Sequence, residues 1–319
     1  MIKRLFTLLT LAIVTICLAA GCGGKKAADS KPAAKTLPPL VIGVLPDVDS
    51  LPLIFARELG YFKEAGVEVK IEQFKSAMDR DAAIQAGAVD GAVSDMLAVA
   101  FFREGGIDAR ITSLTDGSYK VIGAANEPAK TMKELAGKDI AVSRNTIIEF
   151  ITDSALAVEG LDGDAVNKKA VPKIPARLEM LAAGQLPAAT LPEPIASLAL
   201  KDGGHIIVDS AKLGTNPGIM MFTGKALKEK KESIAAMYRA YDRAAKYLNE
   251  TPQKDYIQTL IDKGGFPPAV KDGIVLPKYH PAALPSEKDW QLCQKWLLDK
   301  KLTKKTLTFK EVTESIAAK

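Results

Sequence analysis

Cysteine and histidine are scarce in this chain of 319 residues, which contains three cysteines and two histidines. Cys17 and Cys22 lie near the N-terminus, so only Cys293 remains in the body of the chain and no disulfide can form there. Nucleophilic and metal-dependent catalysis draw on clusters of histidine and cysteine, whereas His205, His280 and Cys293 are widely spaced. Phosphate loops, dinucleotide glycine fingerprints and zinc spacings are also missing from the sequence. We therefore predict a protein that has no cofactor or metal and is not an enzyme.

An excess of one charge is missing from most of the chain. The formal net charge is +5, but the first 35 residues hold six basic residues and one acidic residue, so residues 36–319 sum to about zero. Binding of nucleic acid needs a basic face, and this balance excludes nucleic acid as a partner. The composition, with 47% hydrophobic and 25% charged residues, is that of a globular protein, and the length allows two domains.

Residues 1–21 have the features of an export signal. Two basic residues precede an apolar run over residues 5–19, which is too short to indicate a membrane span. The run leads into LAAGC at residues 18–22, which is similar to the bacterial lipoprotein signal, in which the cysteine is lipidated. Residues 22–39 are rich in Gly, Lys, Ala and Pro and indicate a disordered linker. We expect a protein outside the cytoplasm that is anchored to the membrane by a lipid on Cys22; plain secretion is the alternative.

Strands and helices alternate through the next part of the chain. An apolar run over residues 40–45 is typical of a buried parallel strand, and Ser50 with Pro52 marks the start of a helix. The alternation continues to about residue 223 and indicates parallel βαβ units. From Lys225 onward the pattern is mostly helical, so these helices are expected to pack back against the first units. We predict an α/β protein.

Two similar elements organise this pattern. Residues 81–95 predict a helix closed by glycine and then a short strand that ends at Asp95; residues 175–194 predict the same succession ending at Glu193. Taken singly, each is an ordinary helix–strand unit. As a pair they indicate two similar lobes that offer polar groups at the carboxyl edges of their sheets, where ligands of open α/β sheets bind.

Five stretches resemble the solute-binding proteins of bacterial ABC importers, in the NMT1-like group typed by nitrate, taurine, alkanesulfonate and thiamine-pyrimidine precursor uptake. They are the lipoprotein signal, IGV at 42–44 with LIFARELGYF at 53–62, AGAVDGA at 86–92, LAGKDIAV at 135–142, and the whole of 175–194. The order and spacing of the five carry the resemblance, which covers most of residues 1–200. The C-terminal third matches only in its helical character.

The resemblance implies a periplasmic-binding-protein-like fold of type II, with two βα lobes that are joined by a two-segment hinge and close on a ligand. Lobe 1 is expected to comprise residues 40–118 and 224–319, and lobe 2 residues 119–223, with the return crossing at 218–223. The implied partners are a small-molecule ligand, an ABC permease and its ATPase, and the protein would be a monomer. A pyrimidine-synthase-like enzyme and a sensor docked on a membrane receptor are alternatives on the same fold.

The family's pocket lies between the lobes, and four of its contact loops match positions in this sequence. The candidate ligand-binding residues from these loops are Asp47, Ser50, Leu51, Ser94, Asp95, Arg144, Asn145, Thr146 and Glu193. Asp116 and Asn216 lie near the crossings and are further candidates. For Ser50, Asn145 and Thr146, helix capping is at least as good an interpretation, and Asp49 is equally well a solvated loop acid.

Acids outnumber bases among these candidates, with Arg144 as the only nearby base. Burying an anion beside unpaired carboxylates is costly. We therefore expect a ligand with N–H donors or a positive charge, such as a nitrogen-containing heterocycle or an amine. The alternative is a sulfonate- or nitrate-type anion held by Arg144 and the amides of Asn145 and Thr146.

Overall fold

The computed structural model describes residues 37–316. The predicted signal peptide (1–21), the lipidation site Cys22 and the linker up to residue 36 lie outside the described residues. The end of the linker is held by hydrogen bonds: Ser233 Oγ donates to the carbonyl of Pro38 (2.7 Å) and Lys230 Nζ to that of Pro39 (2.9 Å). Within the described range, no helix combines the length and the apolar character that a membrane crossing needs.

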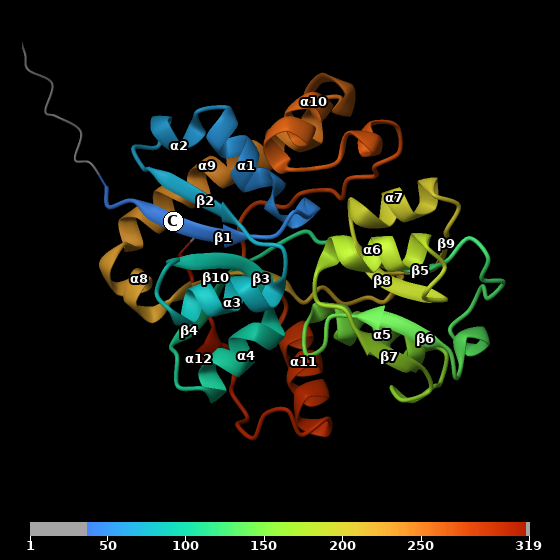
Figure 1. The fold of residues 1–319 in the computed structure, drawn as a ribbon. Helices are drawn as coiled ribbons and strands as arrows, with labels where there is room; N and C mark the ends of the chain where they lie inside the picture. The colour runs from blue at the N-terminus through green and yellow to red at the C-terminus, as the bar shows by residue number, and fades with distance from the viewer. Residues whose placement is uncertain (1–36, 317–319) are drawn as a thin grey trace, which may run out of the picture. The chain divides into compact units, whose positions relative to one another are not determined.

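The first lobe is built on a five-stranded mixed sheet (Figure 1). Its strands, in spatial order, are β2 (Val69–Gln73), β1 (Leu40–Val44), β3 (Gly91–Asp95), β10 (Gly218–Thr223) and β4 (Ala109–Leu114). β1 pairs in parallel with β2 and β3, whereas β10 is antiparallel to both of its neighbours. The inner strands are buried on both faces, which explains why β1 is a continuous apolar run.

The second lobe repeats this arrangement with another five-stranded sheet. Its strands, in spatial order, are β7 (Asn167–Ala170), β6 (Asp139–Val142), β8 (Ala188–Pro192), β5 (Tyr119–Gly123) and β9 (His205–Asp209). β6 is parallel to β7 and β8, and β5 is the antiparallel strand between β8 and β9. β3 and β8, the strands of the two similar sequence elements, therefore hold equivalent places in the two sheets.

Helices cover both sheets. Those of the first lobe are α1 (Leu51–Glu58), α2 (Tyr61–Glu64), α3 (Ala77–Gln85), α4 (Met96–Glu104), α8 (Gly224–Glu229), α9 (Lys231–Glu250), α10 (Gln253–Gly264), α11 (Glu287–Asp299) and α12 (Phe309–Val312). Those of the second lobe are α5 (Ile147–Val158), α6 (Ile174–Ala182) and α7 (Ile195–Lys201). α9 packs on α1 and α2, as Figure 1 shows, so the C-terminal helices return to the first lobe.

The chain crosses between the sheets twice, through residues 115–118 and 210–217. Residues 218–223, expected in the return crossing at the end of lobe 2, instead form β10 in the first sheet. The side chains of Ile219, Met220, Met221 and Phe222 are fully buried there. An apolar run of this kind buries far more surface in the middle of a sheet than in a crossing segment.

Helix α11 contacts both lobes. It packs on α4 through a buried face that includes Trp290 and Cys293. At its other end the Trp296 ring meets Phe150 of α5 edge-on, with ring centroids 5.9 Å apart, and Trp296 Nε1 donates to Asp153 (2.9 Å). Just beyond the helix, Lys300 Nζ lies 2.9 Å from Glu149 and 3.0 Å from Asp153. These contacts form a non-covalent bridge between the lobes, which we call the α11 bridge.

Candidate ligand-binding site

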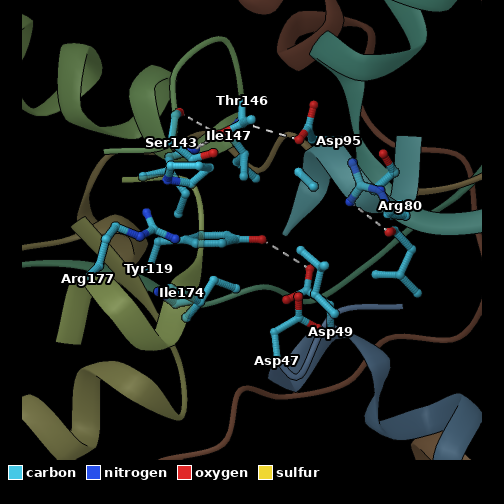
Figure 2. Close-up of a pocket in the computed structure, with 17 residues that line it drawn as sticks. Asp47, Asp49, Arg80, Asp95, Tyr119, Ser143, Thr146, Ile147, Ile174 and Arg177 are labelled. Atoms are coloured by element: carbon cyan, nitrogen blue, oxygen red, sulfur yellow. Dashed lines mark hydrogen bonds between the residues drawn. The ribbon is translucent and has the colours of Figure 1, made fainter. Parts of the chain in front are cut away.

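A cavity lies between the two lobes, where the strands of both sheets present their ends to each other (Figure 2). Its volume, including the part that is open to solvent, is about 480 Å³. This space suits a compact molecule. The first lobe lines it with Leu45, Asp47, Asp49, Ala77, Arg80, Val93, Ser94 and Asp95, and the second with Tyr119, Ser143, Thr146, Ile147, Ile148, Pro172, Ile174, Arg177 and Pro192.

Two acids follow strand β1 and face the cavity. Asp47 accepts a hydrogen bond from Ser50 Oγ (2.9 Å), and Asp49 accepts from Thr115 Oγ1 (3.1 Å) and from the Tyr119 hydroxyl (3.3 Å). Burial raises the pKa of Asp47 well above its usual value, and repulsion from Asp49 adds to this effect. Burial also raises the pKa of Asp49, to about 6, although the hydrogen bond from Thr115 opposes the shift. The pair is therefore destabilising when both acids are ionised and nothing offsets their charge.

A third acid, Asp95, ends strand β3 and reaches across to the second lobe. Its Oδ1 accepts from the backbone N–H of Ala98 (2.9 Å) and caps α4, while its Oδ2 accepts from the backbone N–H of Ile147 (3.4 Å) at the start of α5. Burial raises the pKa of this carboxyl despite the opposing field of Arg80. Asp95 thus links the lobes through the cavity.

Two arginines line the cavity, at matching places in helices α3 and α6. Arg80 Nη1 donates to the carbonyl of Val93 (3.1 Å), and Arg177 Nη1 donates to the carbonyl of Thr190 (2.9 Å). Each donor precedes its acceptor by 13 residues, so both guanidinium groups reach from a helix to the following strand. The sequence pattern behind them, Arg-x-x-x-(Ile/Leu)-x-Ala-Gly, occurs at 80–87 and again at 177–184.

The two arginines differ in their charged neighbours. Burial opposes the charge on Arg80, but Asp81, 2.8 Å away, and Asp95 outweigh it and raise the pKa of Arg80. Arg177 has no carboxylate partner among residues 37–316, and burial alone lowers its pKa to about 9. Of the two guanidinium groups, Arg177 is the one whose charge is not compensated by the described protein.

The structure brings four of the predicted ligand-binding residues to the cavity: Asp47, Ser94, Asp95 and Thr146. Three others lie next to lining residues without lining the cavity themselves. Ser50 Oγ bonds to Asp47, Leu51 is fully buried in the core, and the N–H of Asn145 donates to Glu149 (2.7 Å). Thr146 caps α5 by accepting from the N–H of Ile148, so its capping role and its place in the cavity coexist.

Two further candidates line a separate hollow near the crossing segments. Asp116 accepts from His280 Nδ1 (2.6 Å), and Asn216 Nδ2 donates to the carbonyl of Thr115 (2.8 Å). Arg144 is half-exposed, pairs with Glu149 (3.0 Å) and lines an open groove on the second lobe. The expectation of Arg144 as the sole base near the ligand therefore needs correction, because Arg80 and Arg177 line the cavity itself.

Glu193 is buried but not part of the cavity lining. Its carboxylate lies 2.6 Å from Lys120 Nζ and accepts from the N–H and the hydroxyl of Ser197. The repeated arginines explain this placement. Asp95 comes 15 residues after Arg80, and the residue 15 positions after Arg177 is Pro192, which does line the cavity. Glu193 is one position further, and along an extended chain neighbouring side chains point to opposite sides.

The sequence interpretation missed Arg80, Tyr119 and Arg177, all of which line the cavity. It left Asp49 open between a ligand contact and a solvated loop acid, and the structure buries Asp49 in the cavity lining. A signal for the arginines was present. On α3 the buried residues are Ala77, Arg80 and Ile84, and on α6 they are Ile174, Arg177 and Leu181, with spacings of three and four in both. An arginine in a position of an apolar stripe is a buried arginine. Tyr119 gave no such signal.

Replacing Asp49 by asparagine should stabilise the ligand-free protein at pH 8 and leave it unchanged near pH 4. The raised pKa means that the folded state binds more protons than the unfolded state between about pH 4 and 6, so stability falls as pH rises through this range. The shift from 3.8 to about 6 corresponds to about 3 kcal/mol, which the variant should regain at pH 8. Urea unfolding at both pH values measures this. The exposed Asp272→Asn is the control, and a less stable Asp49→Asn at pH 8 contradicts the prediction.

The fold and the cavity define the class of protein. Two sheets with equivalent strand order, two crossing segments and a cavity between the lobes make up the two-lobe, type II periplasmic-binding-protein fold, which confirms the predicted fold class. The chain belongs to the NMT1/THI5-like family, whose model matches residues 47–255. This range contains every residue of the cavity lining except Leu45.

Solved structures of solute-binding proteins share the fold. The alkanesulfonate-binding protein SsuA from Xanthomonas axonopodis pv. citri, bound to MOPS, has a TM-score of 0.75 at 19% identity over 87% of this chain and 98% of its own. The aliphatic sulphonate-binding SsuA from Escherichia coli has a TM-score of 0.72 at 17% identity over 88% and 92%. A ligand-binding component of an ABC-type import system from Staphylococcus aureus, with zinc bound, has a TM-score of 0.73 at 13% identity over 87% and 96%. No curated protein matches the chain in sequence.

Proposed function

We propose that the protein is an extracytoplasmic solute-binding lipoprotein that captures a small molecule between its lobes and delivers it, as a monomer, to an ABC import permease and its ATPase. The observation that carries the proposal is the cavity between the lobes, lined by three buried acids, Asp47, Asp49 and Asp95. Binding proteins of importers, such as the Staphylococcus aureus component, have the same fold.

The acids favour a ligand that brings N–H donors or a positive charge, such as an amine or a nitrogen heterocycle. Asp49 Oδ1 has no hydrogen-bond partner among the described residues, and a buried acceptor of this kind gains most from a donor on the ligand. An anion at the start of α5 is the less favoured alternative, because the amides there already donate: Asn145 N–H to Glu149 (2.7 Å), Ile147 N–H to Asp95 (3.4 Å) and Ile148 N–H to Thr146 (3.2 Å).

We infer that the cavity binds its ligand without reacting with it. The lining contains no histidine or cysteine within the described part of the chain. His205 bonds to the carbonyl of Ala129, His280 bonds to Asp116, and Cys293 is buried between α11 and its neighbours. A pyrimidine-synthase-like reaction, which calls for such groups, is therefore not favoured.

A ligand screen tests the proposed function. The purified protein is heated with representatives of four classes: amines, nitrogen heterocycles, amino acids and sulfonates. A true ligand at a hundred times its dissociation constant adds about 2.7 kcal/mol to stability and raises the melting temperature accordingly. The proposed function requires at least one hit, and a screen without any hit contradicts solute binding. Stimulation of a permease–ATPase by the ligand-loaded protein then distinguishes an import component from a sensor.

The lipid anchor gives a separate prediction. Cys22→Ser should release the protein from the membrane fraction and leave the fold intact, because Cys22 is the residue at which the signal resembles a lipidation site. Membrane fractionation of cells measures this, with circular dichroism as the check on folding. The matched control is Cys293→Ser, which leaves the predicted anchor in place. A Cys22→Ser protein that stays with the membrane contradicts lipid anchoring.

A further inference from the structure

The Arg177 guanidinium is a buried charge that nothing in residues 37–316 neutralises. The side chain is 1% exposed and lines the cavity, its Nη1 donates to a backbone carbonyl, and its Nε has no hydrogen-bond partner there. Its counterpart in the other lobe, Arg80, lies at the same place relative to its strand but has Asp81 at 2.8 Å and Asp95 nearby.

This difference asks for an explanation, because an unpaired charge in a buried site is costly. A protein that needed only the hydrogen bond to the Thr190 carbonyl would obtain it from a neutral donor. The equivalent arginine of the first lobe is compensated, so an uncompensated arginine is not a feature that both lobes share. The missing negative charge is most simply supplied in the cavity that Arg177 lines.

We propose that the ligand is a zwitterion, whose carboxylate or other compact anionic group binds Arg177 of the second lobe while its ammonium group binds the acids of the first lobe. This inference rests on the proposed solute-binding function and specifies the ligand of the same cavity. In Figure 2 Arg177 lies at one end of the Tyr119 side chain and the Asp47–Asp49 pair lies beyond the Tyr119 hydroxyl at the other end, so the two ends of the ligand would meet opposite charges.

The lining presents charges of both signs. Three carboxyl groups, Asp47, Asp49 and Asp95, face two guanidinium groups, and Arg80 is already paired with Asp81, which lies outside the lining. A purely cationic ligand would leave Arg177 unpaired, and a purely anionic ligand would lie beside the acids.

A planar carboxylate is the anionic group that fits Arg177 best. Guanidinium and carboxylate form parallel hydrogen bonds in one plane, and the Nε of Arg177 has no hydrogen-bond partner among the described residues. Aminosulfonates carry the same charges with a tetrahedral head, and the experiment distinguishes them from amino acids.

The test compares matched probes on the purified full-length protein by calorimetry. The probes are the standard amino acids, β-alanine, 4-aminobutyrate and 3-aminopropanesulfonate, each with its analogues that lack the acidic or the amino group, such as butylamine and butyrate for 4-aminobutyrate. We expect a zwitterion to bind, and its two truncated analogues to bind at least a hundredfold more weakly. If amines, heterocycles or simple sulfonates bind and no zwitterion does, the inference is wrong while the solute-binding function stands. If no class binds, both fail.

Variants of the arginine then test the assigned contact. Arg177→Gln should weaken the zwitterion about tenfold to a hundredfold and change the matched amine less than twofold, because only the zwitterion has an anionic end. Arg177→Lys should restore part of the zwitterion affinity. Arg243→Gln, on the outer surface and paired with Glu64, is the control and should change neither. Equal weakening of zwitterion and amine by Arg177→Gln would mean a purely structural role and overturn the inference.

Discussion

Replacing Arg80 by methionine should lower the free energy of unfolding by about 3–5 kcal/mol, which is the usual cost of removing one partner from a buried ion pair. Arg80 is 3% exposed and lies among Asp81, Asp95 and Asp47, so its loss leaves buried carboxylates without a counter-charge. The same replacement at Arg177 should cost at most about 1 kcal/mol or increase stability, because one hydrogen bond is lost while an unpaired charge is removed.

Urea unfolding at pH 7 of the ligand-free variants measures this contrast. Methionine at both positions keeps the volume and the helix propensity similar, so the two variants are controls for each other. Equal losses at the two positions would contradict the description of Arg80 as a paired and Arg177 as an unpaired charge.

Substitutions of Glu193 and Asp95 should have contrasting effects: the first should mainly lower stability, and the second should mainly weaken ligand binding. Glu193→Gln should cost about 3–5 kcal/mol of stability, since it leaves Lys120 Nζ buried with Asp209, at 3.9 Å, as the remaining acid. Asp95→Asn should cost about 1 kcal/mol or less, because asparagine also caps a helix, but should weaken a ligand with an ammonium or N–H group about tenfold to a hundredfold.

Denaturant unfolding and calorimetry with a ligand from the screen measure the two halves of this prediction. The sequence alone predicts equal effects on binding for both acids, so the contrast tests the structure. If the Glu193→Gln protein has unchanged stability and reduced affinity, Glu193 contacts the ligand. The prediction that Glu193 acts mainly by pairing with Lys120 is then wrong.

Much of the architecture could be predicted because it depends on local signals. The apolar run at residues 40–45 marks β1, and Ser50 with Pro52 marks the start of α1, whose N-cap is Ser50. The return crossing was placed too late because β10 is short, apolar and far in sequence from β3 and β4, its neighbours in the sheet. Strand order between distant segments depends on long-range packing, which a local pattern does not record.

The site was harder to predict than the fold. Asp95 could be predicted because the sequence pattern indicates where its strand ends, and ligands of open α/β sheets bind at such strand ends. The structure places Asp95 in the cavity lining. Glu193 was assigned by the same reasoning, but a shift of one residue sends its side chain to Lys120. Arg177 was overlooked because charged residues are expected on exposed helix faces, and only its spacing to Ile174 and Leu181 indicates that it is buried.

The bridge formed by α11 has a consequence for the speed of ligand exchange. Asp49, Asp95 and Arg177 are each at most 2% exposed, so a ligand reaches them only after the lobes have moved apart. We expect that movement to break the contacts of Lys300 with Glu149 and Asp153 and of Trp296 with Phe150, which join α11 to the second lobe. Association that requires such a conformational change is slower than association with a site that is already open, and release of the ligand requires the same change. We therefore expect the contacts of the α11 bridge to lengthen the residence time of the ligand, although the ligand does not touch them.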